Sequence, residues 1–244
     1  MNLSHSFRIL AKIQTVKNTF ILIIAIFYFN NCFSQDTVGR KNRLTESVTE
    51  RFYVLKSNPK IKEGPYFALY QHKTYIAAGK YKNGKKAGIW QFFNPKGKLV
   101  EKYNYDLKSL TYEARLDSTD DLRFLFDDTL KKTDQVTRPL KIGGCYYGFI
   151  PYVTLFKLPF DTFSVYPPYF KATIELLISP LGRLADYAVH LTSPFYDYDR
   201  TFTMDINLFS DEDRTFSPST LNGKPVLSRI IIQCIVTEDG LDFY

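Results

Sequence analysis

The chain has 244 residues, of which 45% are hydrophobic and 23% charged, and its formal net charge is +7. This composition excludes a disordered or fibrous protein and predicts a folded chain that is long enough for one core or two smaller ones. The chain holds 18 Tyr and 21 Phe but only 3 His, 3 Cys and 2 Met. Because metal and redox sites are built from His, Cys and Met, the composition disfavours that class of enzyme.

Residues 1–34 are typical of a secretory signal peptide. Basic residues without an acidic one precede the apolar run 20–29, which is too short for a membrane-spanning helix. Small residues at the expected positions predict cleavage before Gln35. A lipoprotein modified at Cys32 and an uncleaved anchor are the alternatives. We therefore expect an exported protein, in the periplasm or at the periplasmic face of the outer membrane.

Charge is distributed unevenly along the rest of the chain. Residues 35–110 contain 16 Lys and Arg against 6 Asp and Glu, whereas residues 111–244 contain 13 against 19. This asymmetry favours two modules, and it suggests that the basic one meets an acidic partner or an anionic membrane surface. The alternative is that lysines keep the edges of a small sheet soluble. Nucleic acid is not an expected partner of an exported protein.

The segment 61–106 contains an internal repeat. Turn signals at Asn83-Gly84 and at 95–97 separate four predicted strands of an antiparallel β-meander. The strands are expected at 66–71, 74–82, 88–93 and 98–105. A shift of 24 residues superimposes one pair of glycines and two pairs of aromatic residues: Gly64 on Gly88, Tyr66 on Trp90 and Tyr81 on Tyr105.

The stretch G-K-Y-x-N-G-K-K-x-G-x-W-x-F-F-x-x-x-G-K-L, which starts at Gly79, resembles the MORN-type repeat of the YwqK family. The match covers roughly 63–106. The resemblance implies that the glycines lie in tight turns and that the aromatic residues stack between hairpins, none of them catalytic. It also implies binding to lipids or protein partners, as for other MORN repeats. The residues with these implied structural roles are Gly64, Tyr66, Tyr81, Gly84, Gly88, Trp90, Gly97 and Tyr105.

Two polar segments flank the repeat. Residues 35–60 are predicted to be a lead-in with a short strand at 52–55, and residues 107–139 an acidic linker. The spacing of the linker's aspartates fits no EF-hand loop, so a solvated surface is expected rather than a calcium site. These aspartates are Asp117, Asp120, Asp121, Asp127 and Asp128.

The remaining segment predicts the order strand, strand, helix, strand. Alternating apolar residues at 172–178 and a second strand at 183–192 indicate a hairpin. Phe202, Ile206 and Phe209 have helical spacing, which predicts a helix over 199–209 with Asp197 or Asp199 as its N-cap. The β-branched run 230–236 is the predicted closing strand.

This order, together with F-S-P-S-T-L-N-G-K-P-V from Phe216, resembles the carboxy-terminal domain of the TonB energy-transducer family, over residues 140–244. In that family an extended peptide of an outer-membrane transporter adds to the closing strand. Energy transduction itself is not expected, because the sequence predicts neither a retained transmembrane helix nor a long Pro-rich spacer. The organisation as a whole is typical of a Bacteroidetes-type envelope protein. Phe216 stands where the family usually has Trp. The matching positions are Pro218, Gly223, Lys224, Pro225 and Val226.

The sequence contains few signals of a catalytic or metal site. Cys145 and Cys234 remain after cleavage, and export permits a disulfide between them without requiring it. His72 and His190 have no second ligand at metal-binding spacing. The sequence has no nucleophile elbow, phosphate loop or zinc-protease motif.

The sequence thus predicts an α+β protein, with an N-terminal antiparallel β-meander of MORN-like repeats and a small β-β-α-β TonB-like domain. We expect a non-enzymatic envelope protein without a cofactor, which acts by protein–protein interaction, with an outer-membrane protein among the candidate partners. One alternative is peripheral binding of anionic lipid or lipopolysaccharide through the basic repeat, and another is an enzyme of unrecognised type. The sequence does not indicate an oligomeric state.

Overall fold

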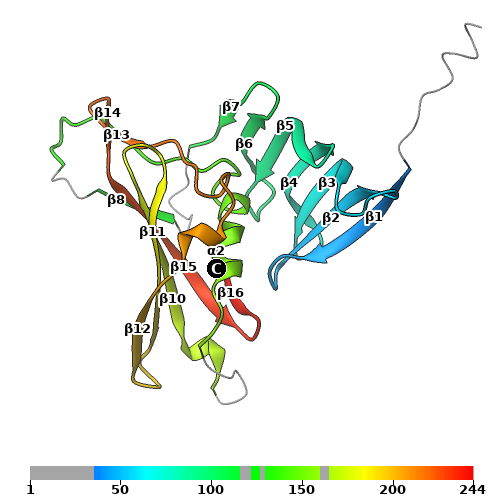
Figure 1. Ribbon diagram of the computed structural model, residues 1–244. Coiled ribbons are helices and arrows are strands. Elements are labelled where there is room, and N and C mark those ends of the chain that lie inside the picture. The colour runs from blue at the N-terminus through cyan, green and yellow to red at the C-terminus, as the bar shows by residue number, and fades with distance from the viewer. Residues whose placement is uncertain (1–35, 116–121, 127–129, 160–164, 244) are drawn as a thin grey trace, which may run out of the picture. The chain divides into compact units, whose positions relative to one another are not determined.

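The computed structural model describes residues 36–115, 122–126, 130–159 and 165–243 (Figure 1). Within these ranges the chain forms three antiparallel sheets, short 3-10 turns and one α-helix, α2 (Ile150–Leu155). The protein is therefore a β-rich member of the α+β class, as the sequence predicts. The predicted signal peptide, residues 1–34, lies outside the described residues. Among those that are described, no helix has the length and apolar character needed to cross a membrane.

The first sheet is a meander of seven strands in chain order, each paired with the next. The order follows from tight connections such as Asn83-Gly84, where φ angles of 50° and 78° form the predicted hairpin turn. The predicted repeat strands are present as β3 to β6, and the lead-in range contributes two further strands. The strands are β1 (Thr37–Arg43), β2 (Val48–Leu55), β3 (Lys62–Tyr70), β4 (Thr74–Lys82), β5 (Lys85–Phe93), β6 (Leu99–Asn104) and β7 (Ser109–Glu113).

The second sheet has the order β12-β11-β10-β15-β16, with β8 also paired to β15. Along β10 and β15 buried and partly exposed residues alternate, because one face of the sheet packs on the core. The strands are β8 (Leu122–Phe126), β10 (Lys171–Ile178), β11 (Leu184–Ser193), β12 (Tyr198–Thr203), β15 (Ser228–Thr237) and β16 (Gly240–Phe243). A third, small sheet consists of β9 (Val136–Thr137), β13 (Ser219–Leu221) and β14 (Lys224–Val226).

The predicted helix over 199–209 is wrong. Residues 198–203 form β12, which pairs with β11, and only one 3-10 turn, η3 (Ile206–Leu208), follows it. Asp205 caps this turn by accepting a hydrogen bond from the backbone N–H of Asn207 (2.9 Å), so neither Asp197 nor Asp199 is the cap. Three apolar residues in a short window cannot distinguish the helical period of about 3.6 residues from the strand period of about two. The Thr and aromatic residues of β12 favour a strand, because β11 offers an edge with which they can pair.

The range predicted as an acidic linker contains β7, β8 and β9. β7 completes the first sheet, β8 pairs with β15, and β9 pairs with β13. All five of the aspartates named above lie outside the described residues.

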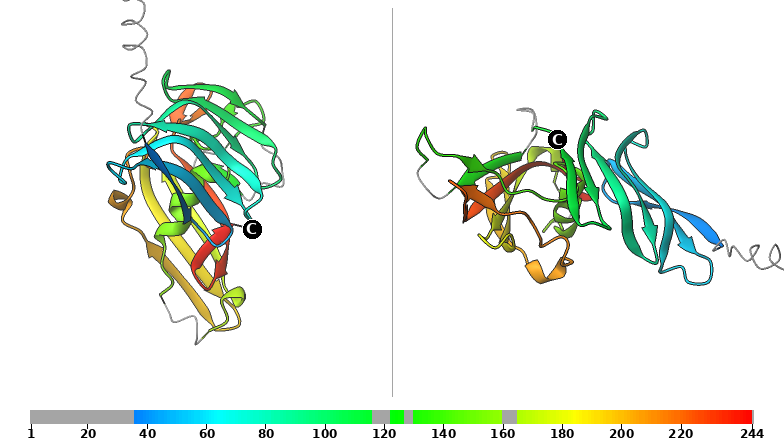
Figure 2. Two further views of the ribbon diagram at one scale, coloured as in Figure 1. Left: turned by 90° about the vertical axis from the view of Figure 1, so that its right-hand side faces the viewer. Right: turned by 90° about the horizontal axis from the view of Figure 1, so that it is seen from above.

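A segment at 146–156, which includes α2, lies between the two large sheets (Figures 1 and 2). On one side Tyr147 stacks on Phe92 of the first sheet, with ring centroids 5.6 Å apart. On the other side the ring of Tyr152 packs against the ring of Tyr187 in β11, with centroids 5.9 Å apart. The segment therefore joins the two sheets into one continuous hydrophobic core.

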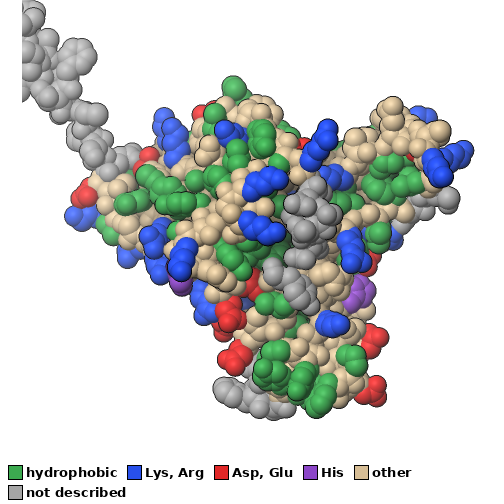
Figure 3. All heavy atoms as spheres, turned by 180° about the vertical axis from the view of Figure 1, so that it is seen from behind, with side chains coloured by type: hydrophobic (Ala, Val, Ile, Leu, Met, Phe, Trp, Pro, Cys, Tyr) green, Lys and Arg blue, Asp and Glu red, His purple; other side chains and the backbone are tan. Residues whose placement is uncertain are grey.

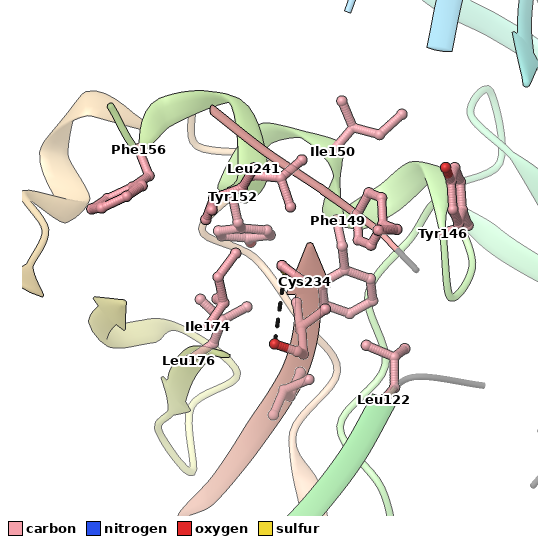
Figure 4. Close-up of a cluster of buried hydrophobic side chains, with 14 of the residues drawn as sticks. Leu122, Tyr146, Phe149, Ile150, Tyr152, Phe156, Ile174, Leu176, Cys234 and Leu241 are labelled. Carbon is pink, nitrogen blue, oxygen red and sulfur yellow. Dashed lines mark hydrogen bonds between the residues drawn. The ribbon is translucent and has the colours of Figure 1, made fainter. Parts of the chain in front are cut away.

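Figure 4 shows this core around Cys234, which is fully buried in β15, with Tyr152 directed toward Ile174 and Leu176. Cys145 is half-buried, and no disulfide joins it to Cys234. Cys234 serves as a small apolar residue of the core.

Polar groups also connect the two sheets. The Glu101 carboxylate of β6 accepts hydrogen bonds from the backbone N–H groups of Gly143 (2.9 Å) and Gly144 (3.1 Å). Buried Asp242 of β16 accepts from the Thr45 hydroxyl (2.9 Å) and the Ser47 N–H (2.8 Å) in the β1–β2 turn. Asp242 thus connects the two sheets directly, whereas Glu101 connects the first sheet to the turn that precedes the segment 146–156.

Candidate binding cleft

A cleft of about 490 Å³ opens where the first sheet faces the segment that precedes and includes α2. Its size falls in the range of small-ligand sites in proteins. Charged residues of both signs line it, together with tyrosines. The charged lining residues are Arg43, Glu50, Lys62, Lys86, Lys141, Glu212 and Asp213, and the tyrosines are Tyr66, Tyr81 and Tyr147.

Beneath the cleft lies a cluster of aromatic rings from the repeat, which we call the aromatic floor: Tyr66 and Tyr81 line the cleft, and Trp90 and Tyr105, which do not line it, belong to the same cluster. Ring centroids lie 5.1 Å apart for Tyr66 and Trp90, 5.3 Å for Tyr81 and Trp90, and 5.7 Å for Trp90 and Tyr105. The repeat thus brings its four predicted aromatic positions together. Trp90 lies directly on Gly79, where an added Cβ would approach its ring to 2.3 Å, so only glycine fits there.

Two lysines cover this floor, and they occupy equivalent positions of the repeat. The Lys62 ammonium lies 4.2 Å from the ring centroid of Phe52 and 5.3 Å from that of Tyr81. The Lys86 ammonium lies 5.2 Å from the centroid of Trp90 and 5.2 Å from that of Tyr105. Both are cation–π contacts. The repeat pattern alone did not distinguish these lysines from the other basic residues, although the shift of 24 residues that aligns the glycines also superimposes Lys62 on Lys86.

Each repeat lysine binds a carboxylate from outside the repeat. Glu50 of β2 accepts from Lys62 at 3.2 Å. Glu212, from the turn after η3, accepts from Lys86 at 2.7 Å and from the Tyr105 hydroxyl at 2.8 Å. Burial alone would raise the pKa of Glu212, but the charge and hydrogen bond of Lys86 and the bond from Tyr105 outweigh it and lower the pKa below its ordinary value.

Lys141 places a third ammonium at the cleft. It is only 4% exposed, and its Nζ donates to the backbone carbonyls of Glu212 (2.6 Å) and Thr215 (3.4 Å). Burial lowers the pKa of Lys141 to about 8, against the opposing effect of the Asp213 and Glu212 carboxylates. Its charge is therefore easier to remove than that of an exposed lysine.

The tyrosines that line the cleft, and Tyr105 of the aromatic floor, are hydrogen-bonding groups. The Tyr147 hydroxyl donates to that of Tyr66 at 2.9 Å. Burial, with nearby carboxylates adding to it, raises the pKa of Tyr66, Tyr81, Tyr105 and Tyr147. The four phenols consequently stay protonated, and the arrangement suits a polar ligand that presents hydrogen-bond acceptors.

The other repeat positions shape the chain around the cleft. Gly64, Gly84, Gly88 and Gly97 have φ angles of 87°, 78°, 64° and 80°. Gly64 pairs with Tyr81 between β3 and β4, and the Gly88 carbonyl accepts from the N–H of Tyr105, so each repeat places its glycine opposite its tyrosine.

The residues of the TonB-like motif lie outside the cleft lining. Phe216 is buried against Tyr152, with Lys141 above its ring at 5.2 Å. Pro218 follows in the loop, next to the position of Gly182. Gly223, with φ of 78°, forms the turn between β13 and β14, and the remaining three positions form β14: Lys224, Pro225 and Val226.

The predicted closing strand, β15, has neighbours on both edges. β10 pairs with it along one edge, while β8 and β16 pair with successive parts of the other. Strand addition at β15 would therefore require that β8 or β16 be displaced. The outer edge of β12, by contrast, has no neighbouring strand among the described residues.

His72 and His190 lie away from the cleft. His190 of β11 contacts Thr201 of β12 (2.9 Å) and Glu175 of β10 (3.2 Å), which forms a polar row across the face of the second sheet opposite the core. His72 contacts the Thr49 hydroxyl at 3.2 Å. Over the described parts of the chain, no group of three or more His, Cys, Asp or Glu residues could hold a metal ion.

Comparison with known proteins found no match to this chain among protein-family models, curated proteins or solved structures.

Proposed function

We propose that this chain is a non-enzymatic protein of the cell envelope that acts by protein–protein interaction. In this proposal a MORN-like sheet and a TonB-like carboxy-terminal domain form a single recognition unit, whose partner is another envelope protein, with outer-membrane proteins among the candidates. The observation that carries the proposal is the cleft, because its floor comes from the repeat and its opposite wall from the carboxy-terminal domain.

The chemistry of the cleft supports recognition. Its lining offers ammonium groups, carboxylates and phenols held over an aromatic floor. Tyrosines are enriched in protein recognition sites, since they combine a large apolar area with a hydrogen-bonding tip.

Recognition would take place in the cleft rather than at the closing strand, β15. In the TonB family that strand accepts a peptide, but here β8 and β16 already pair with it. A TonB-like fold would thus be retained while its binding mode differs, as is common among proteins that share a fold.

Site-directed photocrosslinking in intact cells tests the proposal. A photoreactive residue in place of Ile142, which lines the cleft, should capture an envelope protein. The same residue in place of Leu181, an exposed side chain at the β10–β11 turn, is the matched control and should not. Mass spectrometry of the mature amino terminus from membrane and soluble fractions tests export in the same cells. Recovery of the chain from the medium, with no crosslinked partner at either position, would contradict the proposal.

A second candidate function is peripheral binding to anionic lipid or lipopolysaccharide. It rests on exposed Arg51, Lys80 and Lys85 in the first sheet, with exposed Tyr53 and Ile89 among them. Figure 3 shows Lys and Arg side chains spread over the part of the surface that this sheet forms. Binding to phosphatidylglycerol vesicles should then weaken steeply as salt rises from about 0.05 to 0.5 M, because exposed charges are screened. Binding that is absent or independent of salt excludes this candidate.

A further inference from the structure

We propose that the cleft binds a side-chain carboxylate of an acidic polypeptide segment, and that Glu212 occupies this position in the unbound protein. The inference rests on the proposed function and specifies the chemistry of its partner. An acidic sugar offers the same carboxylate, and the experiment below distinguishes the two sources.

The repeat builds the same carboxylate-binding unit twice. In each copy a lysine precedes the repeat glycine by two residues in the sequence, and its ammonium lies over the ring of the repeat tyrosine. The pairs are Lys62 with Tyr81 and Lys86 with Tyr105. Both copies hold a glutamate, the first Glu50 and the second Glu212. A pattern that appears twice and binds the same group each time indicates that carboxylate binding is a property of the unit.

The two bound glutamates differ in how firmly they are held. The Glu50 side chain is 7% exposed, extends from a central part of β2 and also accepts from the Asn42 side chain at 3.3 Å. The Glu212 side chain is 43% exposed and extends from a turn between η3 and β13. Rotation of Glu212 into solvent breaks no strand pairing, so the second unit is the exchangeable one.

The groups that remain when Glu212 leaves would bind another carboxylate. Lys86 and the Tyr105 hydroxyl keep their positions because the aromatic floor supports them. Lys141 is fixed by two backbone carbonyls and has a third N–H to donate. Charge-assisted hydrogen bonds from an ammonium and a hydroxyl are short and strong. An incoming carboxylate leaves the charge balance unchanged, because it replaces one that has moved into solvent.

Isothermal titration of the full-length chain with a blocked hexaglutamate peptide tests the exchange, with hexaglutamine as the neutral control. Trp90 is the only tryptophan, and the Lys86 ammonium lies 5.2 Å from its ring, so its fluorescence gives an independent signal. Glu212→Gln should bind the peptide at least about tenfold more tightly than the unaltered chain, since an internal competitor is lost. Lys86→Met should abolish binding, and Lys86→Arg should retain part of it.

Lys85→Met is the matched control. Lys85 neighbours Lys86 on β5 but is exposed and does not line the cleft, so its loss should leave the affinity within about twofold. Circular dichroism confirms that each variant is folded, and Glu212→Ala replaces Glu212→Gln if the latter is not. Equal losses in Lys85→Met and Lys86→Met, or no binding by either Glu212 variant, would overturn the inference.

The two sources of carboxylate are separated by a parallel titration with an oligogalacturonate. Preference for the peptide supports the inference, and preference for the sugar overturns the polypeptide assignment.

The photocrosslinking experiment is repeated with Lys86→Met. If an envelope partner is still captured, the carboxylate inference fails while the proposed function holds. If peptide binds but no partner is captured in the unaltered chain, the proposed function fails instead.

Discussion

The two large sheets of this protein are assembled in different ways. The first is a meander in which every strand pairs with its neighbour in the chain, so its pairing depends on tight turns. In the second, β10 pairs with β15 and β8 with β15, across long intervals of sequence. Turn signals therefore predict the central strands of the first sheet, β3 to β6, but they do not indicate which strands pair with β15 in the second. Long-range pairing depends on loop closure and on shared core contacts, which leave no local signal.

The largest effect is expected from the aromatic floor of the first sheet. Trp90→Ala should lower the free energy of unfolding by about 3–5 kcal/mol, because a fully buried indole at the centre of four ring contacts is lost. Urea denaturation followed by far-UV circular dichroism measures the change. Ile89→Ala is the control from the same strand, since Ile89 is exposed, and it should have little effect. A similar loss in both variants would mean that the floor does not dominate the stability of the sheet.

A second prediction addresses the connection between the sheets. Asp242→Ala should cost roughly 3 kcal/mol, because it leaves the buried Thr45 hydroxyl and Ser47 N–H without their acceptor. Asp239→Ala is the matched control. Its ion pair with Arg43 is exposed, so its loss should cost less than about 1 kcal/mol. If Asp239 proved as important as Asp242, the connection would depend on surface charge rather than on buried hydrogen bonds.

The pH dependence of stability gives a third test of this connection. Burial raises the pKa of Glu101 from 4.5 to about 7, although the N–H groups of Gly143 and Gly144 act in the opposite direction. The folded protein therefore binds a proton that the unfolded chain releases between these values. The stabilisation from Glu101 is complete below about pH 4.5 and is lost as the pH rises through about 7, by on the order of 3 kcal/mol.

Denaturation midpoints across pH 4 to 8 measure how the free energy of unfolding falls as the pH rises. Glu101→Gln should make this dependence on pH weaker, because the titrating group is removed. Lys141 changes in a separate, more alkaline window. Its pKa is lowered, so the stability it contributes is present at high pH and lost as the pH falls through about 8. If the pH dependence of stability is the same in Glu101→Gln, a group other than Glu101 is responsible for it.

The smallest effect concerns the local geometry of the repeat. Gly79→Ala should destabilise the first sheet by about 1–3 kcal/mol, because the new methyl group would overlap the Trp90 ring. Gly39→Ala is the control, since its added Cβ would lie 3.7 Å from Tyr53, an ordinary contact. Urea midpoints of the two variants should differ clearly. Equal midpoints would mean that the ring can shift without cost.

The sequence predicted the aromatic residues of the candidate site, but it did not predict that they would lie beneath a cleft. The repeat identified Tyr66, Tyr81, Trp90 and Tyr105, and the structure places all four together in the floor. Lys62 and Lys86 also stand 24 residues apart in the repeat, but the sequence indicates only a basic surface there. Glu212 and Lys141 could not be linked to the repeat from the sequence, because their contacts to it span long intervals of chain.

The sequence by itself determined the elements whose causes are local. Positive φ angles at Asn83 and Gly84 set the hairpin between β4 and β5, and alternation set the buried faces of β10 and β15. Only the tertiary structure decided that residues 198–203 are a strand, because the edge of β11 supplies their partners. It also decided that Glu212 meets Lys86. Turns and periodicity act between near neighbours, whereas sheet edges and buried ion pairs exist only after distant segments have packed together.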